Sequence, residues 1–262
     1  MAKRRTGLPE RMRYWLFLFC LFCTTGHADV PRVAAAADLK FALSEIAALY
    51  EKETGRAVGL SFGSSGHFAR QIPQGAPFEL FLSADEDYIL KLAAAGWTQG
   101  GGHLYAIGRI ALLVPHGAKL RADSELHDLT QALADGRIQR FAIANPEHAP
   151  YGRAARSVLQ RAGLWENLQG KLVLGENVAQ AAQFATSGSA QGGLVAWSLL
   201  KSPEVAKRGT AALIPEDWHP PLRQRMALTR QAGSAARYFY DYLQQPAARA
   251  IFERYGFSLP GK

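Results

Sequence analysis

The sequence predicts an α/β protein made of two lobes, each a mostly parallel sheet flanked by helices. Short apolar runs alternate with helical apolar stripes along the chain, which is typical of parallel sheets covered by helices on both faces. The alternation occurs in two successive sets, without an internal repeat or a long linker. The chain of 262 residues is also long enough to bury a core in each of two lobes. A cleft between the lobes is where a ligand would bind.

The N-terminal segment predicts an export signal. Residues 1–13 carry five Lys or Arg against one Glu, residues 14–23 are almost wholly apolar, and a short run of mostly small or polar residues ends at Ala28. These are the three regions of a secretory signal peptide, so we expect cleavage near Ala28 and a periplasmic protein. The alternative is a membrane anchor, for which the apolar run is short. Cys20 and Cys23 each follow a Phe, which argues against lipid attachment at either cysteine.

Removal of the signal would change the composition of the protein. Both cysteines leave with residues 1–28, so the mature chain would be stable without disulfides, and its net charge would fall from +8 to about +4. The remaining positive charge is scattered, with no basic run interleaved with aromatic residues. We therefore expect no nucleic-acid partner.

The first set of elements occupies residues 30–96. Its strands are expected at 30–36, 57–62 and 78–83. The helix after the first strand shows one apolar stripe at helical spacing, formed by Leu39, Leu43, Ile46 and Tyr50. A second helix starts near Phe68, and a third runs from about residue 85 to 95 and stops at Gly96.

The second set follows a glycine-rich turn at residues 100–102. Its strands are expected at 109–115, 140–144, 171–174 and 193–196, and its helices at 153–162 and 179–186. A strand at 226–229 and helices at 235–243 and 247–255 complete the chain.

Four junctions predict helix N-termini that point out of strand ends. They lie at residues 33–40, 61–67, 150–152 and 176–178. Unpaired N–H groups and the helix dipole make such an end a site for anions, and four ends of about +0.5 charge each approach +2, which matches a tetrahedral dianion. No nucleophile elbow surrounds Ser65, and no His is convincingly paired with it. The chain is thus predicted to be a binding protein and not an enzyme.

Short motifs spread over the whole mature chain resemble one family. They are SFGSSG (61–66), ARQI (69–72), GAPF (75–78), LSAD (82–85), NPEH (145–148), ENV (176–178), FYDYL (239–243) and IFERYGF (251–257). In this order and spacing they are similar to the periplasmic molybdate-binding proteins of ABC importers, which are two-lobed type II solute-binding proteins. The resemblance implies a lobe 1 of residues 29–108 and 226–262, a lobe 2 of residues 109–225, and two crossovers that act as a hinge.

The resemblance also implies the ligand and the partners. A molybdate or tungstate ion would bind in the interlobe cleft and pass to an ABC permease of the inner membrane, with no further cofactor and with the protein as a monomer. Carried over position by position, the ligand-binding residues are Asp38, Ser65, Tyr151 and Val178. Asp38 stands where the family often has Ser or Asn. Ala196 lacks a tyrosine hydroxyl that some members supply, a role that Tyr151 would take over.

Asp38 conflicts with a doubly charged ligand. A carboxylate about 5 Å from a dianion costs roughly 6–7 kcal/mol at an effective dielectric of about 20. Three alternatives remain open: Asp38 turns back to cap its own helix and offers only its N–H, it is protonated, or the ligand is a metal cation or metal complex. We favour the cap, because Asp is a good N-cap residue.

The other predicted contacts have simpler alternatives. Ser65 can donate its hydroxyl and N–H to a ligand or merely help to start its helix, with Ser64 as the N-cap. Tyr151 contacts the ligand or is a surface ring at the mouth of the cleft. Val178 would offer only its amide, with Asn177 as the N-cap.

The histidines do not predict a site for a free metal ion. Glu147 and His148 are adjacent, but no His or Cys accompanies them at ligand spacing. His67, His103 and His219 are isolated in the sequence, and we expect them to lie on the surface.

Overall fold

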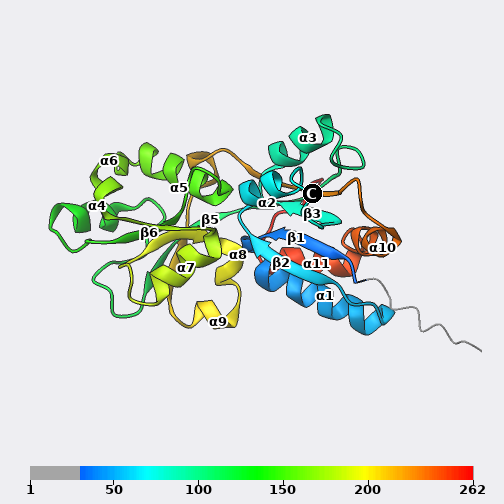
Figure 1. The fold of residues 1–262 in the computed structure, drawn as a ribbon. Coiled ribbons are helices and arrows are strands. Elements are labelled where there is room, and N and C mark those ends of the chain that lie inside the picture. The colour runs from blue at the N-terminus through cyan, green and yellow to red at the C-terminus, as the bar shows by residue number, and fades with distance from the viewer. Residues whose placement is uncertain (1–29, 262) are drawn as a thin grey trace, which may run out of the picture.

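Two five-stranded sheets, each covered by helices, form the two lobes of the protein (Figure 1). The structure is a computed structural model that describes residues 30–261, so the predicted signal peptide lies outside the described residues. Within the described part of the chain, no helix combines the length and the apolar character needed to cross a membrane.

The first lobe contains a sheet with the strand order β2-β1-β3-β10-β4. Its strands are β1 (Arg32–Ala36), β2 (Gly59–Gly63), β3 (Leu80–Ser83), β4 (His103–Gly108) and β10 (Leu222–Leu228). Its helices are the short η1 (Ala37–Leu39), α1 (Lys40–Thr54), α2 (Ser65–Gln71), α3 (Glu86–Ala94), α10 (Ser234–Tyr242) and α11 (Pro246–Arg254).

Strand β1 shows how this lobe is layered. Successive side chains of a strand point to opposite faces. Val33 and Ala35 belong to the core shared with α1, α10 and α11, whereas Ala34 lies in the core under α2 and α3. Both faces of the sheet are therefore buried, which explains why β1 reads as an unbroken run of apolar residues.

The second lobe repeats this plan with the strand order β7-β6-β8-β5-β9. Its strands are β5 (Ile110–Pro115), β6 (Phe141–Ala144), β7 (Leu172–Gly175), β8 (Gly193–Ala196) and β9 (Gly209–Leu213). Its helices are α4 (His127–Ala134), α5 (Pro150–Arg161), α6 (Trp165–Leu168), η2 (Gln169–Lys171), α7 (Val178–Thr186), α8 (Trp197–Leu200), α9 (Pro203–Ala206) and η3 (Glu216–Trp218).

The predicted fold class is confirmed. In each sheet four strands run in one direction and a single strand, β10 or β5, runs against them, so the sheets are mixed but mostly parallel. The chain crosses between the sheets after β4 and again before β10. The residue boundaries of the lobes stay a prediction.

Two strands of the structure, β4 and β9, were not predicted from the sequence. Both lie at the edge of a sheet. Strand β9 (GTAAL) exposes part of its length and has little apolar pattern, whereas the apolar run in β4 (HLYAIG) was overlooked. Strand β10 also begins four residues before its predicted start, because its first half (LRQR) is polar although it pairs with β4.

Candidate functional site

A small cavity lies between the lobes where four helices begin. Its walls come from the starts of η1, α2, α5 and α7, and its volume is about 10 Å³, which is about the space that one water molecule needs. Pockets for organic ligands usually hold roughly 300–1,000 Å³, so this one is too small for an organic ligand. Asp38, Ser65, Tyr151 and Val178 all line it. The structure thus brings the four predicted residues together, and their contact with a ligand stays a prediction.

Ser65 and Ser64 start helix α2 but have different roles. The buried Ser65 Oγ accepts a hydrogen bond from the Ala84 N–H (3.0 Å), so its own proton remains available for a ligand in the cavity. Ser64 stands at the N-cap position without making a side-chain cap. Its hydroxyl donates instead to the His148 carbonyl in the other lobe (2.7 Å). Ser64 is thus the N-cap residue of α2, as predicted, although its side chain bonds across the cleft and not to the helix.

The Asp38 carboxylate does not cap its own helix, so the favoured prediction for this residue is wrong. Oδ2 accepts hydrogen bonds from the Tyr151 hydroxyl (3.0 Å) and from Gln224 Nε2 (2.5 Å). Oδ1 is buried and has no partner among the described residues. Complete burial raises the pKa of Asp38 to about 6, although the hydrogen bonds from Gln224 and Tyr151 act in the opposite direction.

Tyr151 is a buried residue of α5, with 2% of its surface exposed, so the alternative of a surface ring at the cleft mouth is wrong. Its hydroxyl proton goes to Asp38, and burial raises its pKa well above the usual value. A Cβ at Gly108, where the chain leaves β4, would collide with this hydroxyl. The glycine therefore gives Tyr151 the room to reach the first lobe.

Backbone N–H groups complete the walls in the second lobe. Asn177 caps α7 as predicted, because its Oδ1 accepts hydrogen bonds from the amides of Ala179 and Gln180 (3.1 Å each). These bonds do not use the Val178 amide, which begins the helix at the cavity. Pro150 occupies the first position of α5 and has no N–H, so the first amide that α5 can offer is that of Tyr151.

Two further residues of the site, Gln224 and Tyr105, carried no signal in the sequence. Gln224 is fully buried on β10, and its Oε1 accepts a hydrogen bond from the Tyr105 hydroxyl of β4 (2.8 Å). This bond turns the amide NH₂ of Gln224 toward Asp38. The pairing of β10 with β4 brings Gln224 beside Tyr105, and the pairing of β10 with β3, the neighbour of β1, brings it toward Asp38.

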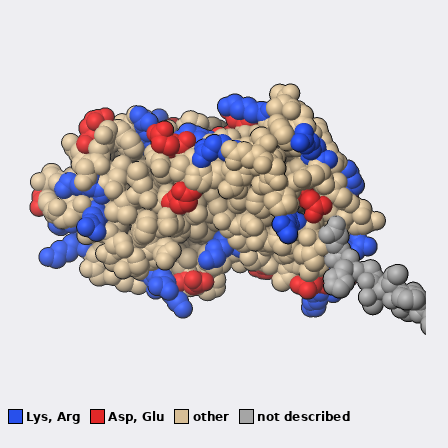
Figure 2. All heavy atoms as spheres, in the orientation of Figure 1, with Lys and Arg blue, Asp and Glu red and all other residues tan. Residues whose placement is uncertain are grey.

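Hydrogen bonds across the cleft hold the lobes against each other. Besides the bonds from Tyr151 to Asp38 and from Ser64 to His148, the Gly66 N–H donates to the His148 carbonyl (3.1 Å). Arg153 of α5 pairs with Asp85. Acidic and basic side chains are interspersed on the face of the molecule shown in Figure 2.

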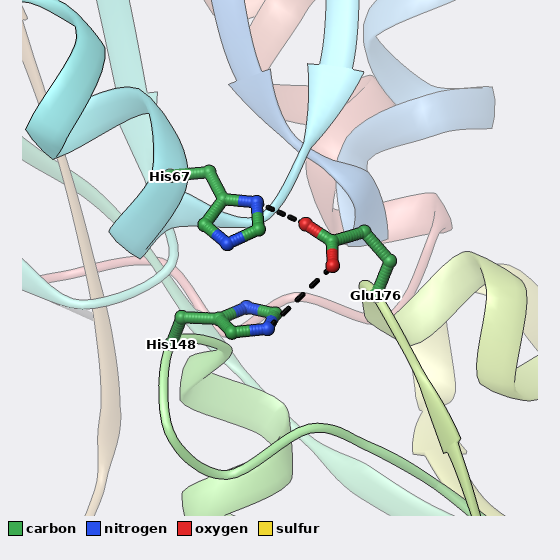
Figure 3. Close-up of side chains that lie close together, drawn as sticks. All are labelled: His67, His148 and Glu176. Atoms are coloured by element: carbon green, nitrogen blue, oxygen red, sulfur yellow. Dashed lines mark ion pairs between the residues drawn. The ribbon is translucent and has the colours of Figure 1, made fainter.

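A second group of polar side chains spans the lobes beside the cavity (Figure 3). The rings of His67 and His148 stack with centroids 4.0 Å apart, and both approach the Glu176 carboxylate. His67, which is isolated in the sequence, therefore meets two possible partners only in the folded protein. His219 is buried, which contradicts its predicted surface position.

Known proteins of similar sequence and structure agree with this architecture. A model of the family "Bacterial extracellular solute-binding protein" matches residues 31–258. The molybdate-binding protein ModA of Rhodobacter capsulatus is 37% identical over 227 residues, or 86% of each chain. ModA of Azotobacter vinelandii is 37% identical over 242 residues, which cover 91% of this chain and 93% of that protein.

The solved structure of the Azotobacter vinelandii periplasmic molybdate-binding protein superimposes with a TM-score of 0.79 at 32% identity. The match covers 88% of this chain and 99% of that one. The resemblance inferred from the motifs is thereby confirmed. The chain belongs to the bacterial extracellular solute-binding proteins, in the family of the molybdate-binding protein ModA.

Proposed function

We propose that this protein binds molybdate or tungstate in the cavity between its lobes and delivers the ion to an ABC permease of the inner membrane. The observation that carries the proposal is the convergence of four helix starts on a cavity too small for an organic ligand. The relatives named for molybdate binding support the choice of ion. The protein would work in the periplasm as a monomer after cleavage near Ala28.

The ligand would be held by donors that carry no net charge. Ser65 supplies a hydroxyl and an amide, and Tyr151 and Val178 supply amides at the starts of α5 and α7. A fully ionised oxyanion has only acceptors, so each of these donors finds a partner. Closure of the lobes replaces the hydration shell of the ion with these groups.

Asp38 would join this set as a donor when it is protonated. Its Oδ1 lacks a partner among the described residues, so a proton on that oxygen is free to bond to a ligand oxygen. The same oxygen, when ionised, would accept a hydrogen bond from a hydrogen-bearing oxyanion such as hydrogenphosphate. This observation makes a protonated oxyanion the second candidate ligand.

A metal cation bound through Asp38 is less favoured. Cations such as Ca²⁺ need several oxygen ligands, and Asp38 is the only carboxylate among the described residues that line the cavity. Its Oδ2 already accepts two hydrogen bonds.

Calorimetry on the protein purified from the periplasm tests these candidates. Molybdate and tungstate should bind tightly in the presence of a chelator, and sulfate and phosphate should bind much more weakly. A preference for phosphate would select the second candidate, and competition between a cation and molybdate would select the third.

A matched pair of variants tests the role of Ser65. Ser65→Ala should weaken molybdate binding, because the cavity loses a hydroxyl donor, whereas Ser44→Ala removes an exposed hydroxyl on α1 and should have no effect. Equal affinities of the two variants would remove the Ser65 hydroxyl from the site.

A further inference from the structure

Three side chains of the kinds that bind transition metals lie together beside the cavity (Figure 3). His67 comes from α2 in the first lobe, and His148 and Glu176 come from the loops before α5 and α7 in the second. One candidate ligand atom from each residue lies within 4.8 Å of those of the other two. The Nε2 atom of His148 is 3.6 Å from Glu176 Oε2, and Nδ1 of His67 is in direct contact with Oε1.

The hydrogen bonds around His148 determine which ring nitrogen is free. Ser64 donates its only hydroxyl proton to the His148 carbonyl (2.7 Å), and His148 Nδ1 lies 3.0 Å from the same hydroxyl oxygen. Nδ1 must then be the donor of that second bond, and in the neutral ring Nε2 carries the lone pair. A lone pair therefore faces a carboxylate oxygen, an arrangement that a positive charge between the two would stabilise.

We propose that His67, His148 and Glu176 form a binding site for a divalent transition-metal ion, with Zn²⁺ as the best fit, that links the two lobes. Two imidazole nitrogens and one carboxylate are a common zinc ligand set that leaves a fourth position for water. The hydrogen bond from His148 Nδ1 to Ser64 orients the ring, as bonds to metal-binding histidines usually do. Burial lowers the pKa of His148, which favours the neutral form that a metal needs.

The position of this site couples it to the oxyanion cavity. Both lobes supply ligands, so all three can bind one ion only when the lobes are closed. Each of the three ligands is also close in sequence to a residue that lines the cavity: His67 to Ser65 at the start of α2, His148 to Tyr151 in α5, and Glu176 to Val178 in α7. If the proposed oxyanion function holds, Zn²⁺ and the oxyanion must raise each other's affinity by the same factor.

Calorimetry with zinc alone tests the site independently of the oxyanion. The protein purified from the periplasm is stripped with a chelator, dialysed and titrated with ZnCl₂, and one ion per chain should bind. His67→Ala and Glu176→Gln should each weaken zinc binding by about tenfold or more, since even the loss of a residue that orients a metal ligand typically costs 10–100-fold. His116→Ala removes an exposed histidine in the turn after β5 and should leave zinc binding unchanged.

Two further measurements complete the test. Crystals grown with ZnCl₂ should show anomalous density at the zinc edge between the three side chains, and circular dichroism should show that the variants are folded. Oxyanion affinity is measured separately with and without zinc, so that a failure of the proposed function is not mistaken for a failure of the metal site.

Three results would overturn the proposal. The first is the absence of zinc binding, which would leave a protonated histidine paired with Glu176 as the link between the lobes. The second is equal zinc affinity in His67→Ala and His116→Ala. The third is zinc binding that leaves oxyanion affinity unchanged, which would refute the link between the lobes.

Discussion

Replacing Asp38 with Asn should strengthen oxyanion binding at neutral pH and remove most of its pH dependence. Asn is nearly isosteric, and its amide oxygen can still accept the hydrogen bonds from Tyr151 and Gln224. Its NH₂ group then takes the place of Oδ1, which has no partner among the described residues, and can donate to the ligand.

The magnitude follows from the charge and the pKa of Asp38. An ionised carboxylate about 5 Å from a dianion would cost roughly 7 kcal/mol at an effective dielectric of about 20, so the ion binds the protonated form. Because the pKa of Asp38 is about 6, only about one molecule in ten is in that form at pH 7, and the apparent affinity is about tenfold below its limit. Above the pKa, the affinity of the natural protein should fall about tenfold per pH unit.

Calorimetry between about pH 6 and 8.5 measures these quantities. The Asp38→Asn variant should bind molybdate about tenfold more tightly than the natural protein near pH 7, with a difference that grows with pH. Buffers of different ionisation enthalpy should also reveal the uptake of about one proton per oxyanion by the natural protein at the alkaline end. A pH-independent affinity of the natural protein, together with weaker binding by Asp38→Asn, would refute this reasoning.

Three further perturbations have defined outcomes. Gly66→Ala should weaken oxyanion binding by about 1–3 kcal/mol, because the new Cβ would collide with the His148 carbonyl across the cleft. In the control Gly170→Ala the new Cβ meets no atom within 4 Å, so this variant should bind normally. Equal affinities of the two variants in calorimetry would contradict this prediction. Asn177→Ala should lower the free energy of unfolding in urea by about 1 kcal/mol through loss of the α7 cap, and an unchanged midpoint would show the cap to be dispensable. In the ligand-free protein, the raised pKa of Asp38 favours the folded state below about pH 4, and this contribution of about 3 kcal/mol is lost as pH rises through about 6. The melting temperature of Asp38→Asn minus that of the natural protein should therefore be larger at pH 7 than at pH 4. An equal difference at the two pH values would contradict this sign.

The sequence predicted the location of the site better than its internal contacts. The starts of η1, α2, α5 and α7 were recognisable because each follows a strand or an apolar run, and strands that run in parallel end at the same edge of a sheet. Asn177 was likewise predictable as an N-cap, since the cap bonds are local.

The contacts of Asp38 and His67 could not be predicted in this way. Asp38 bonds to residues 113 and 186 positions away, Tyr151 and Gln224, so a local preference for capping lost to tertiary donors. His67 meets His148 only because the lobes close, and no spacing within either segment signals that contact. Gln224 lies in a polar run whose register is set by pairing with β4.

The position of β10 in the first sheet has a consequence for the order of folding. This strand lies between β3 and β4 and pairs with both, yet it is made after every strand of the second lobe. A chain that emerges from its N-terminus can therefore assemble residues 110–213 while the first sheet is still divided into two pieces with open edges. The early segments must remain unaggregated until the C-terminal part arrives, which makes that interval the step most exposed to misassembly.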